Sequence, residues 1–452
     1  MLLLPALLSA TPPDFALQCD DALRSPPAVL SRTLPGLLET LAAAPLPPVE
    51  RLNRYAALQD ACAQAAEWLQ GELRLRELST APRAREAAWL ARRLAQGRLA
   101  VLLRAVDEAL RAHDSTRASH VIGTAQLAMQ DVALAHLTGY HPLPDDFWDN
   151  AHALHRLAGE LNVDADALAY KALRLIGMVD TQRLSPAQQH KLAALAVQVS
   201  PLLGLMPGTP PLLDTAALAD WLRERSLSLA REGTADAQDD AELYQTLLTD
   251  LRSRPMRREV RERGRGSVEL VAGLAACWHL ANGGRWHFPD TGHDEEELEH
   301  RARLLQRPAP ASPVNLTVVD LSGSGLSLAG SAPGHALRAG EFVLWRARGQ
   351  NWQGALVRWV RYGDDMDTRV GLEIVARRVE PLMVVEPKSG RSQLALSLEH
   401  PQHPPLVLLA GRVFNRLAPC LLVGHGVRAR AYPLRVARQT PLYQLIEHRA
   451  GA

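Results

Sequence analysis

The fold of the second half of this chain is decided by the stretch LTVVDLSGSGLSL, residues 316–328. Apolar runs flank the turn-forming residues 322–325, a pattern that predicts two antiparallel strands joined by a tight turn. Around the turn, Asp320, Ser322 and Gly325 form an Asp-x-Ser-x-x-Gly motif. The aspartate and serine side chains can bind a polar ligand, and the glycine lets a ligand approach the backbone closely.

Short strand-like segments with glycine-containing turns follow this hairpin at even spacing: Glu341–Arg346, Gly354–Val360 and Thr368–Val375. Before it, the hydrophobic residues 268–280 predict either a long or bent first strand or a strand that leads into a short helix. Together these segments predict a small antiparallel β-barrel. The tail contains further candidate strands, at Val407–Phe414, Leu421–Val423 and Tyr432–Val436, and a short strand or helix near Tyr443–Glu447.

Alanine and leucine dominate the first 250 residues, and apolar residues recur there at three- and four-residue spacing, as on one face of a helix. Prolines and capping residues separate the predicted helices, which lie at about 52–69, 82–113, 114–137, 144–161, 186–199, 214–231 and 239–252. The pattern fits a helical solenoid or an irregular helical bundle. Either arrangement can offer a protein-binding surface, although the sequence identifies no partner.

The length of 452 residues exceeds one hydrophobic core of usual size, so we expect two or three domains. The fold class is multidomain α + β. We place an all-helical domain at residues 1–250, a β-barrel at 251–385 and a C-terminal β-rich extension at 386–452. A polar insertion at 282–312, with an acidic run at 294–297, interrupts the barrel.

An arginine cluster lies between the last predicted helix and the first β segment: Arg252, Arg254, Arg257, Arg258, Arg261, Arg263 and Arg265. Guanidinium groups donate paired hydrogen bonds to phosphate oxygens or to O6 and N7 of guanine, and they stack on base planes. An aspartate such as Asp320 can accept hydrogen bonds from N1 and N2 of guanine. The cluster and the motif together suit a guanine nucleotide, whereas each alone also fits a solvated linker or a structural β-turn.

At these residues the chain resembles the PilZ family, whose members bind the bacterial second messenger cyclic di-GMP. That family joins an Arg-x-x-x-Arg element before the first strand to an [Asp/Asn]-x-Ser-x-x-Gly element. Later strands of the family look like Ala355–Val360 and Val370–Ile374 of this chain. The resemblance covers about residues 255–380, excludes the helical half, and implies a PilZ-like antiparallel β-barrel.

The resemblance also implies a cyclic di-GMP site, formed by Arg261, Arg265, Asp320, Ser322 and Gly325. Arg257 and Arg258 are the competing arginines, because the run from 257 to 261 has a similar spacing. The chain departs from the family in the 55 positions from Arg265 to Asp320, which exceed the usual separation. The polar insertion accounts for this excess if it loops out of the barrel; folded over the pocket, its acidic run would repel phosphate.

Other features argue against an enzyme, a metal site and a nucleic-acid binder. The net charge is only +1, whereas general DNA and RNA binders are more basic. The four cysteines form no zinc motif, and His152 and His155 lack a third ligand. No nucleotide-triphosphate loop, nucleophile elbow or acid–base pair is present. We therefore expect no catalysis, no cofactor and no metal, and we assign Trp345, Trp352 and Trp359 to the barrel core.

The apolar residues 1–10 lack a basic segment and are broken by Pro5, so we expect an arm that docks on the helical domain instead of a cleaved signal peptide. No stretch reaches the ~20 apolar residues that span a bilayer. Scattered single cysteines fit reduced thiols, so we expect a cytoplasmic protein.

Two functional hypotheses follow. The first is a cyclic di-GMP receptor that relays the messenger level to a helical interaction domain, with motility or biofilm regulation suggested by family analogy. The alternative is a degenerate PilZ scaffold or adaptor that binds no nucleotide and acts on an unknown protein through its helices.

Overall fold

The computed structural model allows most of the chain to be described. The described residues are 2–75, 81–163, 167–232, 234–252, 262–286, 312–331, 337–363, 367–385, 392–401, 403–410, 419–424, 427–439 and 443–450. The chain forms two compact units, one made of residues 1–223 and 247–254 and the other of residues 224–246 and 255–452. The predicted fold class, a helical part followed by an antiparallel β-barrel and a β-rich extension, is confirmed.

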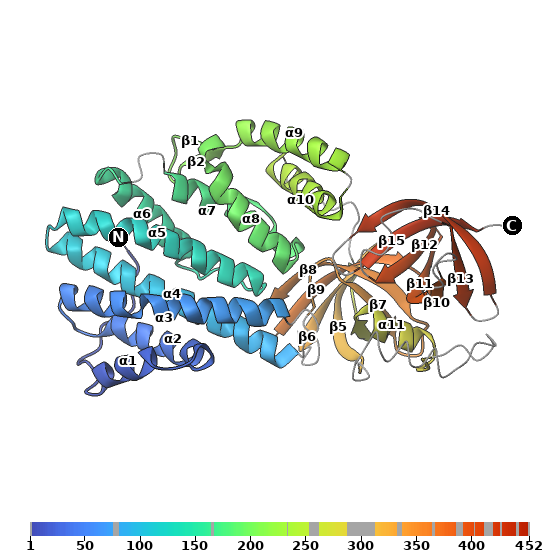
Figure 1. Cartoon of the computed structure of the whole chain (residues 1–452), viewed down its shortest axis with the longest axis horizontal. Helices are drawn as coiled ribbons and strands as arrows, with labels where there is room; N and C mark the ends of the chain where they lie inside the picture. The colour runs from blue at the N-terminus through green and yellow to red at the C-terminus, as the bar shows by residue number, and fades with distance from the viewer. Residues whose placement is uncertain are drawn as a thin grey trace. The chain divides into compact units, whose positions relative to one another are not determined.

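The first unit is built of helices, shown in blue to green in Figure 1. Their bounds are α1 (Phe15–Leu23), α2 (Pro27–Ala43), α3 (Pro48–Leu75), α4 (Ala81–Arg111), α5 (Ser115–Thr138), α6 (Phe147–Glu160), α7 (Leu168–Met178) and α8 (Pro186–Val199). A two-stranded ribbon of β1 (Gly204–Met206) and β2 (Leu212–Asp214) follows. The helices α9 (Ala216–Glu232) and α10 (Ala235–Arg252) each have residues in both units.

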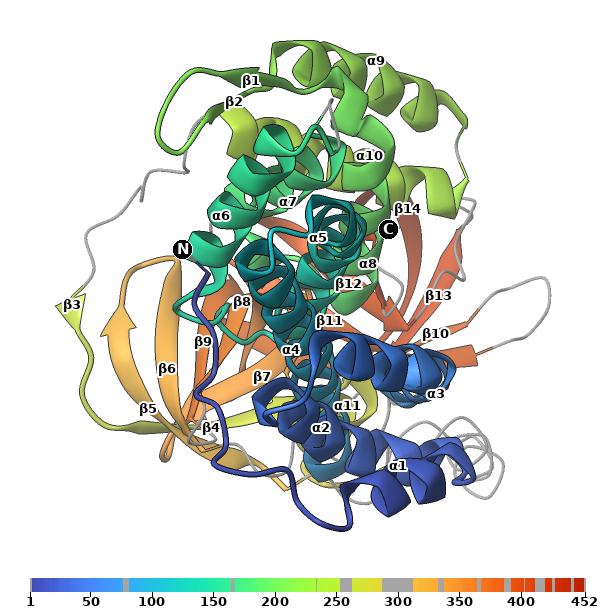
Figure 2. The ribbon, with the colours of Figure 1, turned by 90° about the vertical axis from the view of Figure 1, so that its left-hand side faces the viewer.

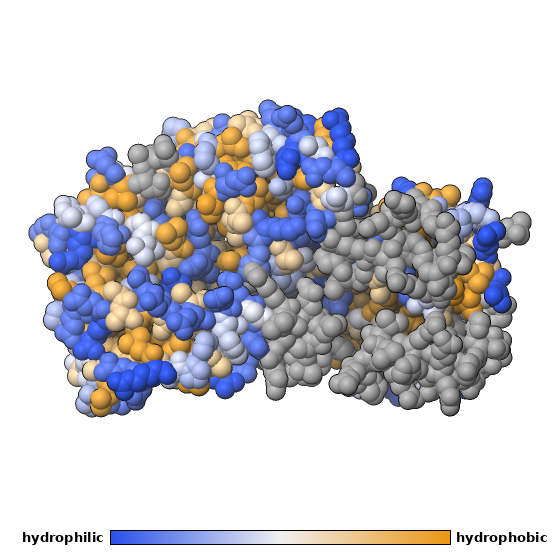
Figure 3. Space-filling model, in the orientation of Figure 1, coloured by the Kyte–Doolittle hydropathy of each residue, from blue (hydrophilic) through white to orange (hydrophobic). Residues whose placement is uncertain are grey.

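Local sequence explains where several of these helices begin. The Asp114 side chain accepts a hydrogen bond from the Arg117 backbone N–H at the start of α5. Ser185 and Gln188 form the capping box expected before α8, with Pro186 at the first helical position. On the face shown in Figure 3, hydrophobic and hydrophilic side chains are interspersed over the helices. None of the described helices is both long and apolar enough to cross a membrane.

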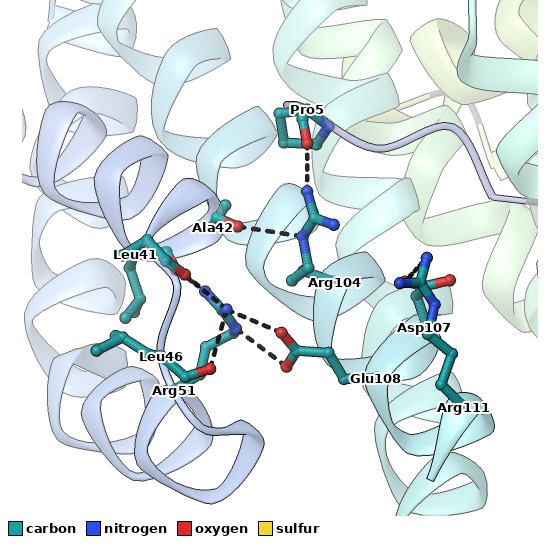
Figure 4. A network of polar contacts seen from close by, with 10 residues as sticks. Pro5, Leu41, Ala42, Leu46, Arg51, Arg104, Asp107, Glu108 and Arg111 are labelled. Carbon is teal, nitrogen blue, oxygen red and sulfur yellow. Dashed lines mark hydrogen bonds and ion pairs between the residues drawn. The ribbon is translucent and has the colours of Figure 1, made fainter. Parts of the chain in front are cut away.

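The N-terminal arm packs on the helices, as expected. Leu2 is buried, and Asn150 in α6 binds both the N–H and the carbonyl of Leu3 at 2.8 and 3.3 Å. Arg104 in α4 donates to the carbonyl of Pro5 and so holds the arm two residues beyond Leu3. These contacts make the arm part of the helical unit, and Figure 4 shows the one between Arg104 and Pro5.

A buried arginine holds the end of α2. The Arg51 side chain has no exposed surface and donates to the carbonyls of Leu41, Ala44 and Leu46, which follow or end that helix. It also forms a 2.8 Å ion pair with Glu108 of α4 (Figure 4). The last carbonyls of a helix have no intrahelical partner, so Arg51 replaces the water that they would otherwise need.

The second unit contains the predicted barrel. Its strands are β3 (Glu262–Arg263), β4 (Ser267–Ala272), β5 (Val314–Leu321), β6 (Gly325–Ser331), β7 (Phe342–Ala347), β8 (Gln353–Tyr362) and β9 (Asp367–Ala376). They are ordered β3-β5-β4-β7-β8-β9-β6, and a further β5–β6 pairing closes the ring. A short helix, α11 (Leu274–Ala281), follows β4, so the second reading of residues 268–280 is correct.

The tail forms a second closed barrel. Its strands are β10 (Arg378–Val385), β11 (Ser392–His400), β12 (His403–Ala410), β13 (Cys420–Gly424), β14 (Val427–Gln439) and β15 (Tyr443–Ala450), in the order β10-β11-β12-β15-β14-β13. The sequence did not predict β10 or β11. The end of the chain near Tyr443–Glu447 is a strand, not a helix. The predicted strand at 407–414 is described only to Ala410.

Both barrels have the same connectivity. When the six ring strands of each barrel are numbered in chain order from β4 and from β10, the same pairs are neighbours: first with second, second with third, third with sixth, sixth with fifth, fifth with fourth, and fourth with first. One hydrophobic core joins the barrels around α11, where the fully buried Trp278 donates to the carbonyl of Leu382 at 2.8 Å. The C-terminal barrel is therefore a topological copy of the one before it.

Candidate functional site

The chain that carries the arginines runs directly beside the Asp-x-Ser-x-x-Gly motif. The short strand β3 pairs with β5 so that Arg263 lies opposite Asp320, and Glu262 opposite Leu321. Residues paired in this way in an antiparallel sheet project from the same face. Figure 2 shows β3, β5 and β6 together at this edge of the barrel. The last two arginines of the cluster thus reach the motif, although 55 positions separate Arg265 from Asp320.

Arg265 sits in a bulge of this edge. Residues 263–267 lie opposite only four residues of β5, 317–320, so one residue is extra. Gly266 has a positive φ of 91°, which suits a glycine-containing bulge. At Gly264 an added Cβ would lie 2.3 Å from a methyl carbon of Val318, so only glycine fits there. The two glycines present Arg265 on the surface, where its side chain is exposed.

The turn after β5 is tied together by its own residues. The Ser322 backbone N–H and hydroxyl both donate to the carbonyl of Gly325, at 2.7 and 3.2 Å. The Ser324 carbonyl accepts from the N–H of Ile374 in β9, at 2.8 Å. An added Cβ on Gly325 would lie 2.4 Å from the carbonyl oxygen of Leu372. The motif glycine is therefore required by the close approach of β6 and β9, before any ligand is considered.

Charged and apolar groups surround this turn. Glu373, which pairs with Gly325, forms a 2.6 Å ion pair with Arg358, so the carboxylate next to the turn is neutralised. Arg377 donates to the carbonyl of Gly323 at 2.9 Å. The side chains of Val319 and Leu321 are 41% and 42% exposed on either side of Asp320. The edge therefore offers guanidinium donors, a carboxylate acceptor and apolar surface, which suits a nucleotide with anionic phosphates and a flat base.

Two parts of the chain match known protein-family models. Residues 289–381 match the family model described as the middle PilZ domain of the cyclic di-GMP receptor FimW. The resemblance to the PilZ family is therefore confirmed for the segment 289–381. Residues 19–210 match the model of the N-terminal domain of the same receptor, FimW, so the helical unit also has a counterpart there. Among curated proteins and solved structures, no significant match was found.

The PilZ match has a boundary that matters for the site. It contains β5 to β9 and the whole Asp-x-Ser-x-x-Gly motif, and it ends within β10. The arginine segment, β3 and β4 precede it. The match therefore includes the motif residues but not the arginines, which are connected to the PilZ barrel by the β3–β5 pairing.

The structure brings together four of the predicted site residues on adjacent strands and one turn: Arg265, Asp320, Ser322 and Gly325. Arg257, Arg258 and Arg261 lie outside the described residues, so the choice between the two arginine pairs stays a prediction. The polar insertion is described only at residues 282–286 and 312. Two arginines were not assigned to the site from sequence: Arg263, which lies opposite Asp320, and Arg377, which contacts the turn.

The tryptophans assigned to the barrel core and the two histidines considered as metal ligands pack against neighbouring side chains or backbone. Trp345 is buried in the PilZ barrel, Trp352 lies under Arg346 at 4.2 Å, and Trp359 lies against Gly371. His155 stacks on Tyr170 with ring centres 4.0 Å apart, and His152 shares a 2.9 Å hydrogen bond with the same tyrosine. Within the described ranges, no three His, Cys, Asp or Glu side chains are grouped as metal ligands.

Proposed function

We propose that this chain is a cyclic di-GMP receptor that binds the nucleotide at the edge of the PilZ barrel formed by β3 and β5. The observation that carries the proposal is the pairing of Arg263 with Asp320, because it joins the arginine segment to the Asp-x-Ser-x-x-Gly motif. Cyclic di-GMP has two phosphates and two guanines. A cluster of guanidinium groups beside a carboxylate complements both kinds of group.

Each predicted residue has a role in this site. Arg265, exposed in the bulge, donates to a phosphate or to O6 and N7 of a guanine, and Arg261 or the pair Arg257 and Arg258 supplies the second guanidinium. Asp320 accepts from N1 and N2 of a guanine. Ser322 binds a phosphate oxygen or a base edge by turning its hydroxyl away from the Gly325 carbonyl, 3.2 Å distant. Gly325 keeps the turn close to β9.

The arginine segment also suggests how binding is transmitted. Residues 253–261 connect α10, which ends at Arg252, to β3, which begins at Glu262. A nucleotide that binds these arginines holds the segment against the barrel. It therefore favours those chain conformations in which the segment between α10 and β3 can reach the nucleotide. The ligand shifts that equilibrium by the difference between its affinities for the two conformations. The helical unit would then act on a protein partner as a cytoplasmic, non-catalytic effector.

Calorimetric titration of three variants tests the site. Each charge-assisted hydrogen bond contributes about 1.5–3 kcal/mol, so Asp320→Ala and Arg265→Ala should each weaken cyclic di-GMP binding by about 10- to 100-fold. Arg430→Ala is the matched control, because Arg430 is an exposed arginine on β14 of the second barrel. Unchanged affinity in both site variants would refute the site, and equal losses in all three would indicate a general charge effect.

A further inference from the structure

The shared connectivity of the two barrels places an arginine in corresponding positions. In the PilZ barrel, Arg263 before the first ring strand lies opposite Asp320 at the end of the second. In the C-terminal barrel, Arg378 at the start of the first strand lies opposite Glu399 at the end of the second. Arg378 forms ion pairs with Glu399 at 3.8 Å and with Glu380. Both barrels thus begin with an arginine beside a carboxylate.

The second barrel lacks the turn that completes such a site. Where the PilZ barrel has Ser322 to Gly325, the sequence after Glu399 reads His-Pro-Gln-His-Pro. It has no serine for the turn and no glycine for close approach, and prolines remove backbone donors. The arginine before Arg378 makes its contact elsewhere: Arg377 reaches back to the turn of the PilZ barrel.

Arg377 connects three elements. Its guanidinium donates to the carbonyl of Gly323 in the motif turn at 2.9 Å and to Oε1 of Gln353 in β8 at 3.0 Å. Its backbone N–H donates to the carbonyl of Glu399 in β11 at 2.9 Å. Arg377 is also the residue between β9, which ends at Ala376, and β10, which begins at Arg378. The motif turn and the first hairpin of the second barrel are therefore joined through one residue.

We propose that Arg377 is a positioning residue of the cyclic di-GMP site, which holds the Ser322–Gly325 turn in its binding geometry and couples the occupied turn to the C-terminal barrel. A guanidinium suits this role because its planar fork can bridge two acceptors, whereas an ammonium is a single point charge. Gly323 is fixed through its carbonyl, so Ser322 and Asp320 keep their positions relative to β9. The inference rests on the proposed function for its ligand.

The hydrogen bonds of Arg377 explain how binding at the turn would affect the second barrel. Three of the five N–H groups of Arg377 make no hydrogen bond within the described part of the chain, and the side chain is exposed beside the turn. A phosphate bound at the turn attracts the Arg377 guanidinium and restricts the mobility of that side chain. Because the backbone N–H of the same residue is bonded to Glu399, the restraint reaches β11 of the second barrel.

Two substitutions separate positioning from simple charge. Arg377→Ala should weaken cyclic di-GMP binding about 10-fold, the loss expected for one charge-assisted hydrogen bond at an exposed position. Arg377→Lys keeps the charge but not the bridge, so it should show most of that loss. Gln353→Ala removes the second acceptor of the bridge and should show part of that loss, whereas the control Arg430→Ala should keep the wild-type affinity. Wild-type affinity in Arg377→Ala or in Arg377→Lys would overturn the proposal.

Amide hydrogen exchange of the ligand-free protein gives a second readout, which does not depend on nucleotide binding. The N–H groups of Ser322 and Ile374 both bond within the turn region. In Arg377→Ala they should exchange about 10-fold faster than in the wild type, while those of α5 should be unchanged. Equal exchange would overturn the positioning role. If the wild-type protein binds no nucleotide but exchange still increases, the proposed function fails and the positioning role is retained.

Discussion

Replacing the motif glycine tests whether the Asp-x-Ser-x-x-Gly turn is held by packing. In Gly325→Ala the new Cβ would lie 2.4 Å from the carbonyl oxygen of Leu372, whereas ordinary contacts begin at 3.4 Å. The neighbouring atom is backbone and belongs to the β6–β9 pairing, so no side chain can rotate out of the way. One strand must move by about 1 Å, and overpacking of this kind costs about 1–3 kcal/mol.

Scanning calorimetry of the full-length protein measures this cost. For a unit of about 200 residues, each kcal/mol lowers the unfolding temperature by about 2–4 °C, so the barrel transition should fall by about 2–12 °C. The control is Gly363→Ala at the β8–β9 turn, where the nearest atom to an added Cβ is 3.6 Å away. That variant should stay within about 2 °C of the wild type. Equal unfolding temperatures for the two variants would refute the packing argument.

Two further predictions concern buried charges. Arg51→Met should lower the free energy of unfolding of the helical unit by about 3–5 kcal/mol in urea titrations, because Glu108 and the end of α2 lose their partner. Arg54→Met, which removes a partly exposed pair within α3, should cost less than about 1 kcal/mol, and equal losses would contradict this account. Burial raises the pKa of Glu341 to about 7 although Arg338 opposes the shift, so the folded state holds this proton more tightly than the unfolded state. The stability from Glu341 is then present below pH 4.5 and lost as the pH rises through 7; Glu341→Gln should flatten that part of the pH profile of the unfolding temperature, and an unchanged profile would contradict it.

Most of the helices and the PilZ barrel could be predicted because their patterns are local, whereas α1, α2 and α7 were not predicted. Helical spacing and capping residues mark α5 and α8, and the turn of residues 322–325 fixes the β5–β6 hairpin. The strand β10 was missed because Pro381 lies in it and lacks a backbone donor. The next strand, β11, does alternate, with Leu394, Leu396 and Leu398 buried, so its pattern was available in the sequence.

The site residues likewise fall into those that a local pattern predicts and those that only the tertiary structure brings together. Asp320, Ser322 and Gly325 come together because they are neighbours in sequence. The proximity of Arg265 depends on the register of β3 and β4 against β5, which the sequence could indicate only through the family resemblance. The contact of Arg377 with Gly323 spans 54 positions and depends on closure of the barrel, so no local pattern predicts it. Contacts fixed by tertiary pairing are the ones that sequence reasoning missed.

Isothermal titration of the full-length wild-type protein with cyclic di-GMP tests the receptor function, with GTP as the control nucleotide. A receptor should bind cyclic di-GMP saturably with a dissociation constant of micromolar or tighter, about −8 kcal/mol or more favourable, and should show no comparable binding of GTP. A flat titration with cyclic di-GMP would contradict the receptor function. The barrel would then be a scaffold, and the activity of the protein would have to lie with the partners of its helices.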